Sequence, residues 1–442
     1  MPAQIHYITL QDETPRKGKL DWFRNNKLSD LEMERIHPDE KGNWLNITDN
    51  DFQDLLPLAS KEVKGNKAGV EFDKAVFKLF STGISTNRDE WIIDFSPKEL
   101  SNKMKFFTDF YNNLDKNNLD FDTRVKWSRN LKQQLSRGNK EEFDKNRIQK
   151  INYRPFTPTY FYNSEIFIDE HGQTKDIFRD KNRVIALRNS TSNKDFHILG
   201  VDTIYDLHFT GDTQAVPLYR YDEIGNRIEN ITDWGLEQFL NHYKATANPP
   251  KGFEPLGGLM MGGLITINKE TIFHYVYAVL HNPAYRKKYE QNLKRDFPRI
   301  PFYDDFGQWA AWGKALMDLH IAYENAALFP LSRVERNAHG TVINPKTKLK
   351  ADKEAGTIEI DEQTTLTGVP TEAWAYKLGN RSALEWILDQ YKESKPTDPT
   401  ILEKFNHYRF ADYKKEVIVL LQKVCTVSVE TMRIIRAMEA VK

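Results

Sequence analysis

Tyr153-Arg154-Pro155-Phe156-Thr157-Pro158-Thr159-Tyr160-Phe161-Tyr162 is the stretch on which our prediction of the fold depends, because it packs five aromatic residues, two prolines and one arginine into ten positions. Proline fixes φ and biases the preceding residue toward extended backbone, so we expect Arg154 and Thr157 to be extended and the segment to be stiff. Such a ribbon carries Arg and Tyr side chains that stack on flat groups and donate forked hydrogen bonds, which suits base edges and sugar-phosphate. The alternative is a buried strand whose aromatic rings fill a core.

The composition excludes a uniformly basic protein. The chain has 442 residues, enough for roughly two or three domains, and its 63 Lys and Arg balance its 63 Asp and Glu. The charge is nevertheless uneven along the chain. The segment from Asp30 to Asp54 contains eight acids and two bases, whereas the segment from Arg124 to Lys150 contains nine bases and three acids. A basic middle permits a surface that faces phosphate, although a solvated helix face is the commoner origin of such a run.

Cysteine usage and hydropathy indicate the compartment. Cys425 is the only cysteine, so the sequence has neither a disulfide framework nor a thiolate metal site, which favours a reducing cytoplasm. No signal peptide precedes Ile5 and no apolar run reaches the length of a membrane span. We therefore expect a cytoplasmic protein with no membrane partner.

Periodicity predicts a mixed α+β chain. We expect strands at Ile5–Leu10, at Val76–Ile84 paired with Trp91–Phe95, and at Val184–Leu187 and Phe196–Leu199 within a strand-rich region from Ile151 to Tyr221. Helices are expected after Ser96, which starts a Ser-Pro-x-Glu capping pattern, over the basic stretch Arg124–Leu135, and from Phe273 to Leu293. A second capping box at Ser382 opens a helix toward Tyr391, and apolar residues from Val417 to Ile435 mark closing helices. Gly356–Leu366 alternates like a β-hairpin.

These elements group into three parts. Residues 1–68 read as a polar connector with short helices, 69–255 as an α/β domain with short strands, and 256–442 as a mainly helical C-terminal part with a hairpin insertion near 356–366. The polar segment Asp222–Pro255 is the expected boundary between the second and third parts.

Motifs for catalysis are missing. The sequence has no Gly-x-x-x-x-Gly-Lys-Ser/Thr loop for a nucleotide triphosphate, and its eleven histidines are scattered rather than clustered at zinc spacing. Asn248-Pro249-Pro250-Lys251 approaches the Asn-Pro-Pro-aromatic motif of amino-methyltransferases, but Lys251 cannot stack on a flipped base as an aromatic ring does. We therefore expect no catalytic residue, no metal site and no cofactor site in this chain.

Features that suit recognition are present in two polar turns. Thr86-Asn87-Arg88-Asp89 lies between predicted strands, and Asn and Arg are the bidentate readers of adenine and guanine edges. In the alternative interpretation, Asn87 and Asp89 cap their own turn and Arg88 pairs with Asp89. The loop from Arg188 to Lys194 is also suited to phosphate or base contacts.

Several stretches together resemble the C-terminal target-recognition (specificity) region of type ISP restriction-modification enzymes. They occur in the family's order over nearly the whole chain: Gly83–Trp91, Tyr153–Phe156, Asp206–Phe209 with Pro217–Tyr219, Tyr275–Arg286, Phe297–Phe302, Leu378–Trp386 and Thr426–Thr431. Family members are long polypeptides that combine a nuclease, an ATP-driven translocase, an adenine methyltransferase and this specificity region. One departure follows Tyr391, where Lys392–Pro399 is shorter than the loop that members often carry.

The resemblance implies a module that recognises a double-stranded DNA sequence and positions methyltransferase and translocase/nuclease domains, present in cis or encoded separately. It implies that S-adenosylmethionine, ATP and Mg²⁺ bind those other domains and that residues up to about Lys67 follow the methyltransferase core. The residues that we predict to contact DNA are Asn87, Arg88, Arg154, Tyr160, Ser190, Thr191 and Lys194. Two alternatives stay open: an adenine methyltransferase active in its own right, and a structural coupling module without DNA contact.

Overall fold

The computed structural model of the chain describes residues 4–10, 14–38, 44, 50–59, 74–114, 124–188, 195–246, 266–336 and 345–441. These residues form two compact units, Met1–Asp54 and Leu55–Lys442. The predicted boundaries at 68 and 255, the Asn248–Lys251 stretch, and three of the predicted contacts, Ser190, Thr191 and Lys194, lie outside the described residues.

The smaller unit is a short antiparallel pair of strands with one helix. Strand β1 (Ile5–Tyr7) pairs with β2 (Glu34–Ile36), and α1 (Arg16–Asn25) lies between them in sequence. Two single-turn helices complete it, Leu28–Asp30 and Asp51–Asp54. The predicted strand at Ile5 is confirmed, although it ends at Tyr7 rather than Leu10.

The larger unit begins with a four-stranded antiparallel sheet in the order β4-β10-β8-β9. Its strands are β4 (Ser81–Thr82), β10 (Gln214–Pro217), β8 (Val184–Leu187) and β9 (Ile198–Val201). The last three are buried along their whole length, as apolar runs predict for strands covered on both faces. Small antiparallel pairs flank this sheet: β3 (Leu56–Pro57) with β13 (Arg299–Ile300), and β11 (Tyr219–Tyr221) with β12 (Arg227–Glu229).

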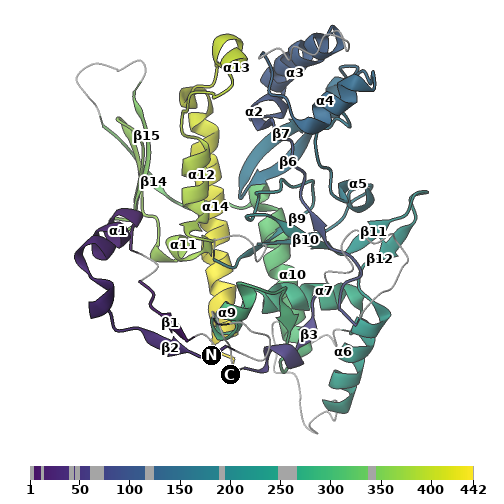
Figure 1. The fold of residues 1–442 in the computed structure, drawn as a ribbon, viewed down its shortest axis with the longest axis vertical. Helices are drawn as coiled ribbons and strands as arrows, with labels where there is room; N and C mark the ends of the chain where they lie inside the picture. The colour runs from purple at the N-terminus through teal and green to yellow at the C-terminus, as the bar shows by residue number, and fades with distance from the viewer. Residues whose placement is uncertain are drawn as a thin grey trace. The chain divides into compact units, whose positions relative to one another are not determined.

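A second, three-stranded sheet in the order β5-β7-β6 carries a helical cap. It contains β5 (Ile93–Asp94), β7 (Thr157–Tyr162) and β6 (Ile148–Arg154), with α2 (Asp89–Ile92), α3 (Pro97–Asn112), α4 (Arg129–Ser136) and a short turn of helix at Lys145–Arg147. Figure 1 shows α3 and α4 above the β6–β7 hairpin. Helix α5 (Thr174–Ile177) follows this sheet in the chain.

The Tyr153–Tyr162 segment is not one continuous ribbon, so our prediction of its shape was wrong in part. Arg154 ends β6 and Thr157 begins β7, but the chain reverses between them because Phe156 adopts a positive φ of 53°. The Phe156 ring is buried and packs edge-on against Tyr323, 5.2 Å away between ring centroids. The hairpin tip thereby anchors this sheet to the C-terminal part of the unit.

The predicted pairing of Val76–Ile84 with Trp91–Phe95 is also wrong. Strand β4 pairs with β10 and β5 pairs with β7, so the two segments belong to different sheets. Residues Asp89–Ile92 form α2 instead of continuing a strand. Alternating apolar residues fitted both assignments, and long-range pairing decided between them.

The C-terminal part is mainly helical, as predicted. Helix α6 (Asp233–Thr246) precedes this part. The helices from residue 256 onward are α7 (Lys269–Val279), α8 (Pro283–Lys288), α9 (Glu290–Leu293), α10 (Phe306–Ile321), α11 (Thr371–Ala375), α12 (Ala383–Gln390), α13 (Pro399–Lys404) and α14 (Phe410–Glu439), with a single turn at Tyr323–Asn325. Helix α14 is continuous where we predicted several closing helices, and Figure 1 shows it beside α11 and α12. Helices α7 and α10 pack closely, since a Cβ at Gly313 would lie 1.7 Å from the His274 carbonyl oxygen.

The predicted hairpin at 356–366 is part of a larger antiparallel sheet with strand order β14-β17-β16-β15. The strands are β14 (Ser332–Glu335), β15 (Thr347–Asp352), β16 (Thr357–Asp361) and β17 (Thr364–Thr367), and a further pair joins β18 (Lys377–Leu378) to β19 (Arg381–Ser382).

Local capping chemistry agrees with the sequence. The Ser96 side chain accepts a hydrogen bond from the Glu99 N–H, and Ser382 and Glu385 form the full capping box. The predicted helix over Arg124–Leu135 begins only at Arg129, because Ser128 caps it by accepting from the Leu131 N–H. Among the residues that the structure describes, every helix is too short or too polar to cross a lipid bilayer.

Candidate nucleic-acid interface

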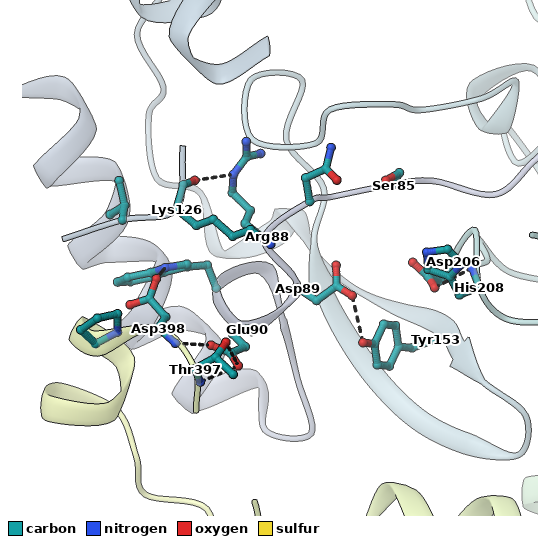
Figure 2. A pocket seen from close by; sticks show the side chains of 14 residues that line it. Ser85, Arg88, Asp89, Glu90, Lys126, Tyr153, Asp206, His208, Thr397 and Asp398 are labelled. Atoms are coloured by element: carbon teal, nitrogen blue, oxygen red, sulfur yellow. Dashed lines mark hydrogen bonds between the residues drawn. The ribbon is translucent and has the colours of Figure 1, made fainter. Parts of the chain in front are cut away.

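A polar pocket of about 630 Å³ lies where the Ser85–Trp91 segment meets the β6 hairpin and the start of α13. Five segments of the chain supply its lining residues. These are Ser85, Asn87, Arg88, Asp89, Glu90 and Trp91; Val125 and Lys126; Tyr153 at the end of β6; Asp206 and His208; and Thr397, Asp398 and Pro399. Figure 2 shows Asp206 and His208 on one side of the pocket and Thr397, Glu90 and Asp398 on the other. We call this pocket the recognition pocket.

Asn87 is an exposed residue that lines the recognition pocket. The residue adopts a left-handed backbone with φ of 55°, a conformation that Asn tolerates better than most residues. Its Nδ2 donates to Asp169 Oδ2 over 2.7 Å, and its Oδ1 has no partner within the described residues. One end of the amide is therefore fixed while its carbonyl oxygen faces no protein donor.

Arg88 lies beneath Asn87 and is fully buried. Its guanidinium forms an ion pair with Asp169 at 2.9 Å and also donates to the Phe167 carbonyl oxygen and to Ser128 Oγ. Burial lowers the pKa of Arg88, whereas the Asp169 charge opposes that shift. The side chain is held by protein partners, so the prediction that Arg88 contacts DNA stays a sequence prediction that this geometry does not favour.

The carboxylates that line the pocket are engaged with the protein. Asp89 accepts hydrogen bonds from the Tyr153 hydroxyl over 2.9 Å and from Thr86 Oγ1. Glu90 accepts from the backbone N–H groups of Thr397 and Asp398, each over 2.9 Å. Burial raises the pKa of Tyr153 well above its ordinary value, with Arg154 opposing the shift, so its hydroxyl remains a donor. Through these hydrogen bonds, the carboxylates of Asp89 and Glu90 connect the Ser85–Trp91 segment to β6 and to the residues just before α13.

Arg154 reaches the edge of this network. It forms an ion pair with the buried Asp206 at 2.7 Å, and its guanidinium covers the Tyr153 ring at 3.8 Å from the centroid. Burial raises the pKa of Asp206, and the Arg154 charge opposes this. Through Asp206, which lines the recognition pocket, Arg154 is linked to the pocket, although it is not one of its lining residues.

Tyr160 lies elsewhere. It lines a second pocket of about 500 Å³ together with Phe95, Tyr391 and Tyr413, on the side of α14. The structure therefore does not join Tyr160 to the recognition pocket.

Two lining residues had no individual role in our sequence reasoning, although Lys126 belongs to the basic stretch from Arg124 to Lys150. Lys126 is exposed at the rim, and no ion pair of its ammonium occurs within the described residues. His208 is exposed beside Asp206, within the Asp206–Phe209 stretch that contributed to the family resemblance but carried no role of its own. The segment after Tyr391 also reaches the pocket, through Thr397 and Asp398. In the part of the chain that the structure describes, no three His, Cys, Asp or Glu residues are grouped to hold a metal ion.

Three solved structures that resemble this chain are complexes with DNA or with a DNA substrate mimic. The DrdV–DNA complex matches with a TM-score of 0.87 and 40% identity over 99% of this chain. A nuclease-deletion mutant of the type ISP restriction-modification enzyme LlaGI, in complex with a DNA substrate mimic, matches with a TM-score of 0.73 and 27% identity over 98% of the chain. The ATP-dependent type ISP restriction-modification enzyme LlaBIII bound to DNA gives 0.74 and 26% over 94%.

A family model described as the type ISP C-terminal specificity domain matches residues 75–420. The chain therefore belongs to that family, as its motifs predicted. It spans 43%, 33% and 26% of the DrdV, LlaGI and LlaBIII chains, respectively. A search of curated proteins found no match.

Proposed function

We propose that this chain recognises a specific sequence of double-stranded DNA and positions the other domains of a type ISP restriction-modification system on it. The family membership and the DNA-bound state of all three solved relatives support this proposal. The observation that carries it is Asn87, an exposed amide that lines a polar pocket and is fixed at one end by Asp169. An amide presented in this way can read an adenine edge in the major groove.

The rigid support of Asn87 determines how it would act. Asp169 binds both Asn87 and Arg88, while the Ser85 N–H donates to the Glu170 carbonyl oxygen over 2.8 Å. We assign Arg88 a positioning role. Its guanidinium is hydrogen-bonded to Ser128 and paired with Asp169, and these contacts hold the loop in place while Arg88 itself stays buried. Order before binding reduces the entropy that the loop loses in the complex.

Phosphate contacts would come from the basic stretch Arg124–Lys150. Its exposed bases include Lys126 at the pocket rim and, further along, Arg129, Arg137, Lys140 and Lys145. Such contacts hold the duplex in register without reading sequence. The pocket itself is rich in acids that are already hydrogen-bonded, so we place base reading there and phosphate binding on the surrounding surface.

Selection from a randomised duplex pool tests this proposal directly. The chain should enrich one sequence at low salt, and Asn87→Ala should lose discrimination at one base pair by roughly 1–3 kcal/mol. Lys126→Ala should weaken binding to all sequences and reduce the salt dependence by about one phosphate contact. Asn241→Ala and Lys377→Ala, exposed residues that do not line the recognition pocket, are matched controls. Failure of the wild-type chain to enrich any sequence overturns the proposal and favours a coupling module.

We further propose that S-adenosylmethionine, ATP and Mg²⁺ are bound by domains other than this one, and that the protein acts in the cytoplasm. The missing glycine-rich and phosphate-binding motifs support the first statement, and the single cysteine supports the second. Calorimetry of the purified chain with S-adenosylmethionine tests the first. Saturable micromolar binding would favour an adenine methyltransferase in this chain.

A further inference from the structure

The turn that carries His208 is hydrogen-bonded through its backbone to the segment that carries Asn87. The Ile84 N–H donates to the Tyr205 carbonyl oxygen over 3.0 Å, and the Leu207 N–H donates to the Ile84 carbonyl oxygen over 2.8 Å. The two segments approach so closely that a Cβ at Gly83 would lie 2.5 Å from the Asp206 carbonyl group. The two side chains therefore project from backbones that hold a fixed relation to each other.

The turn itself is stiffened from within. Asp206 Oδ1 accepts a hydrogen bond from the His208 N–H over 2.9 Å and is paired with Arg154 at 2.7 Å. The imidazole stands outside this buried network, with 56% of its side-chain surface exposed. It lines the recognition pocket, and Figure 2 shows it on the side opposite Glu90 and Thr397.

One ring nitrogen of His208 lies beside a carboxylate, and the other has no partner within the described residues. His208 Nδ1 lies 3.3 Å from Asp212 Oδ1, and within the described residues Nε2 has no partner. In the neutral ring that carries its hydrogen on Nδ1, toward Asp212, the lone pair on Nε2 can accept a hydrogen bond. An acceptor in the major groove pairs with an exocyclic amine, N6 of adenine or N4 of cytosine.

We propose that His208 is a specificity-determining residue whose Nε2 accepts a hydrogen bond from the exocyclic amine of an adenine or cytosine in the target. This inference rests on the proposed function and adds a second reader, on a segment different from that of Asn87. Asn87 and His208 come from different segments that line the same pocket, so the two readers can be tested separately.

Base analogues that lack the amine test the assignment. In the selected target, single adenines are replaced by purine and single cytosines by pyrimidin-2-one, and dissociation constants are measured for the wild-type chain and for His208→Ala. At one position the wild-type chain should lose roughly 5- to 100-fold in affinity, whereas His208→Ala should bind natural and substituted duplexes equally. His37→Ala, an exposed histidine of the smaller unit, is the matched control and should behave as wild type.

Each other outcome overturns the inference. If His208→Ala keeps the wild-type sensitivity at every position, the imidazole reads no amine. If the variant instead weakens binding to all sequences and lowers the salt slope by about one, His208 contacts phosphate. A parallel series with Asn87→Ala separates the two proposals, since loss of discrimination by that variant alone leaves the proposed function intact. Thermal unfolding of His208→Ala should match wild type, because its side chain is exposed.

Discussion

The carboxylate of Asp169 binds Asn87 and Arg88 together, accepting from the Asn87 amide over 2.7 Å through one oxygen and pairing with the Arg88 guanidinium at 2.9 Å through the other. Asn87 is exposed, whereas the Arg88 side chain is wholly buried and that of Asp169 nearly so. One buried ion pair therefore supports one exposed amide. Substitutions at these neighbouring positions should separate stability from recognition.

Arg88→Ala should destabilise the chain strongly. Removing one partner of a buried ion pair leaves the Asp169 carboxylate buried without its cation, which typically costs about 3–5 kcal/mol. Urea denaturation should show this loss as a lower midpoint with an unchanged slope. Arg137→Ala, an exposed arginine just after α4, should change the free energy of unfolding by less than about 0.5 kcal/mol. A change of similar size in both variants would contradict the role assigned to Arg88.

Asn87→Gly should lose base discrimination and the hydrogen bond to Asp169 without straining the turn. Glycine adopts a positive φ without strain, so the backbone at 55° is preserved while the amide disappears. Asn87→Ala should lose the same discrimination but also strain the turn by roughly 1–2 kcal/mol. Comparing the two variants by denaturation and by binding to matched and mismatched duplexes separates backbone from side chain. Retention of full discrimination by the glycine variant would rule out reading by the amide.

Local signals in the sequence predicted the helices well. Ser96 and Ser382 cap helices with their own neighbours, and the apolar stripe from Leu100 to Tyr111 is buried as its spacing indicates. The pairing of short strands was not predictable in this way. The alternating pattern of the segment from Val76 is equally compatible with pairing to β10, its actual neighbour, and with pairing to the residues after Trp91.

The site could be predicted only in part, for a similar reason. The sequence indicates that Asn87 lies in a polar turn, and the alternative interpretation paired Arg88 with the adjacent Asp89. The actual partner of Arg88, Asp169, is far along the chain, and no local pattern indicates that contact. His208 was missed, and Lys126 was not singled out within its basic stretch, because exposed residues of these types are common and only the fold brings them to one pocket.

Glu90→Ala should release the segment before α13 from the pocket. The Glu90 carboxylate accepts hydrogen bonds from the backbone of Thr397 and Asp398, each over 2.9 Å, and hydrogen bonds to charged groups contribute about 1.5–3 kcal/mol each. Amide hydrogen exchange at these two residues should accelerate, whereas exchange in α14 should not change. Glu165→Ala, whose carboxylate is exposed and pairs with Lys175, is the control. Unchanged protection at Thr397 and Asp398 would show that other contacts, such as Trp91 to Asp398, hold the segment alone.

Stability should fall in mild acid because of His274. Burial lowers the pKa of His274 to about 4, and the positive charges of Arg183 and Lys314 lower it further while Asp318 opposes them. In the unfolded chain His274 has its ordinary pKa of 6.5 and binds a proton as the pH falls from 6.5 toward 4, whereas in the folded chain it stays neutral over this range. The free energy of unfolding is therefore unaffected by His274 above pH 6.5 and decreases as the pH falls toward 4. The loss at this one site amounts to about 3 kcal/mol over that range. Denaturation of wild type and His274→Asn as a function of pH should give a shallower slope for the variant, and equal slopes would show that His274 is protonated in the folded state.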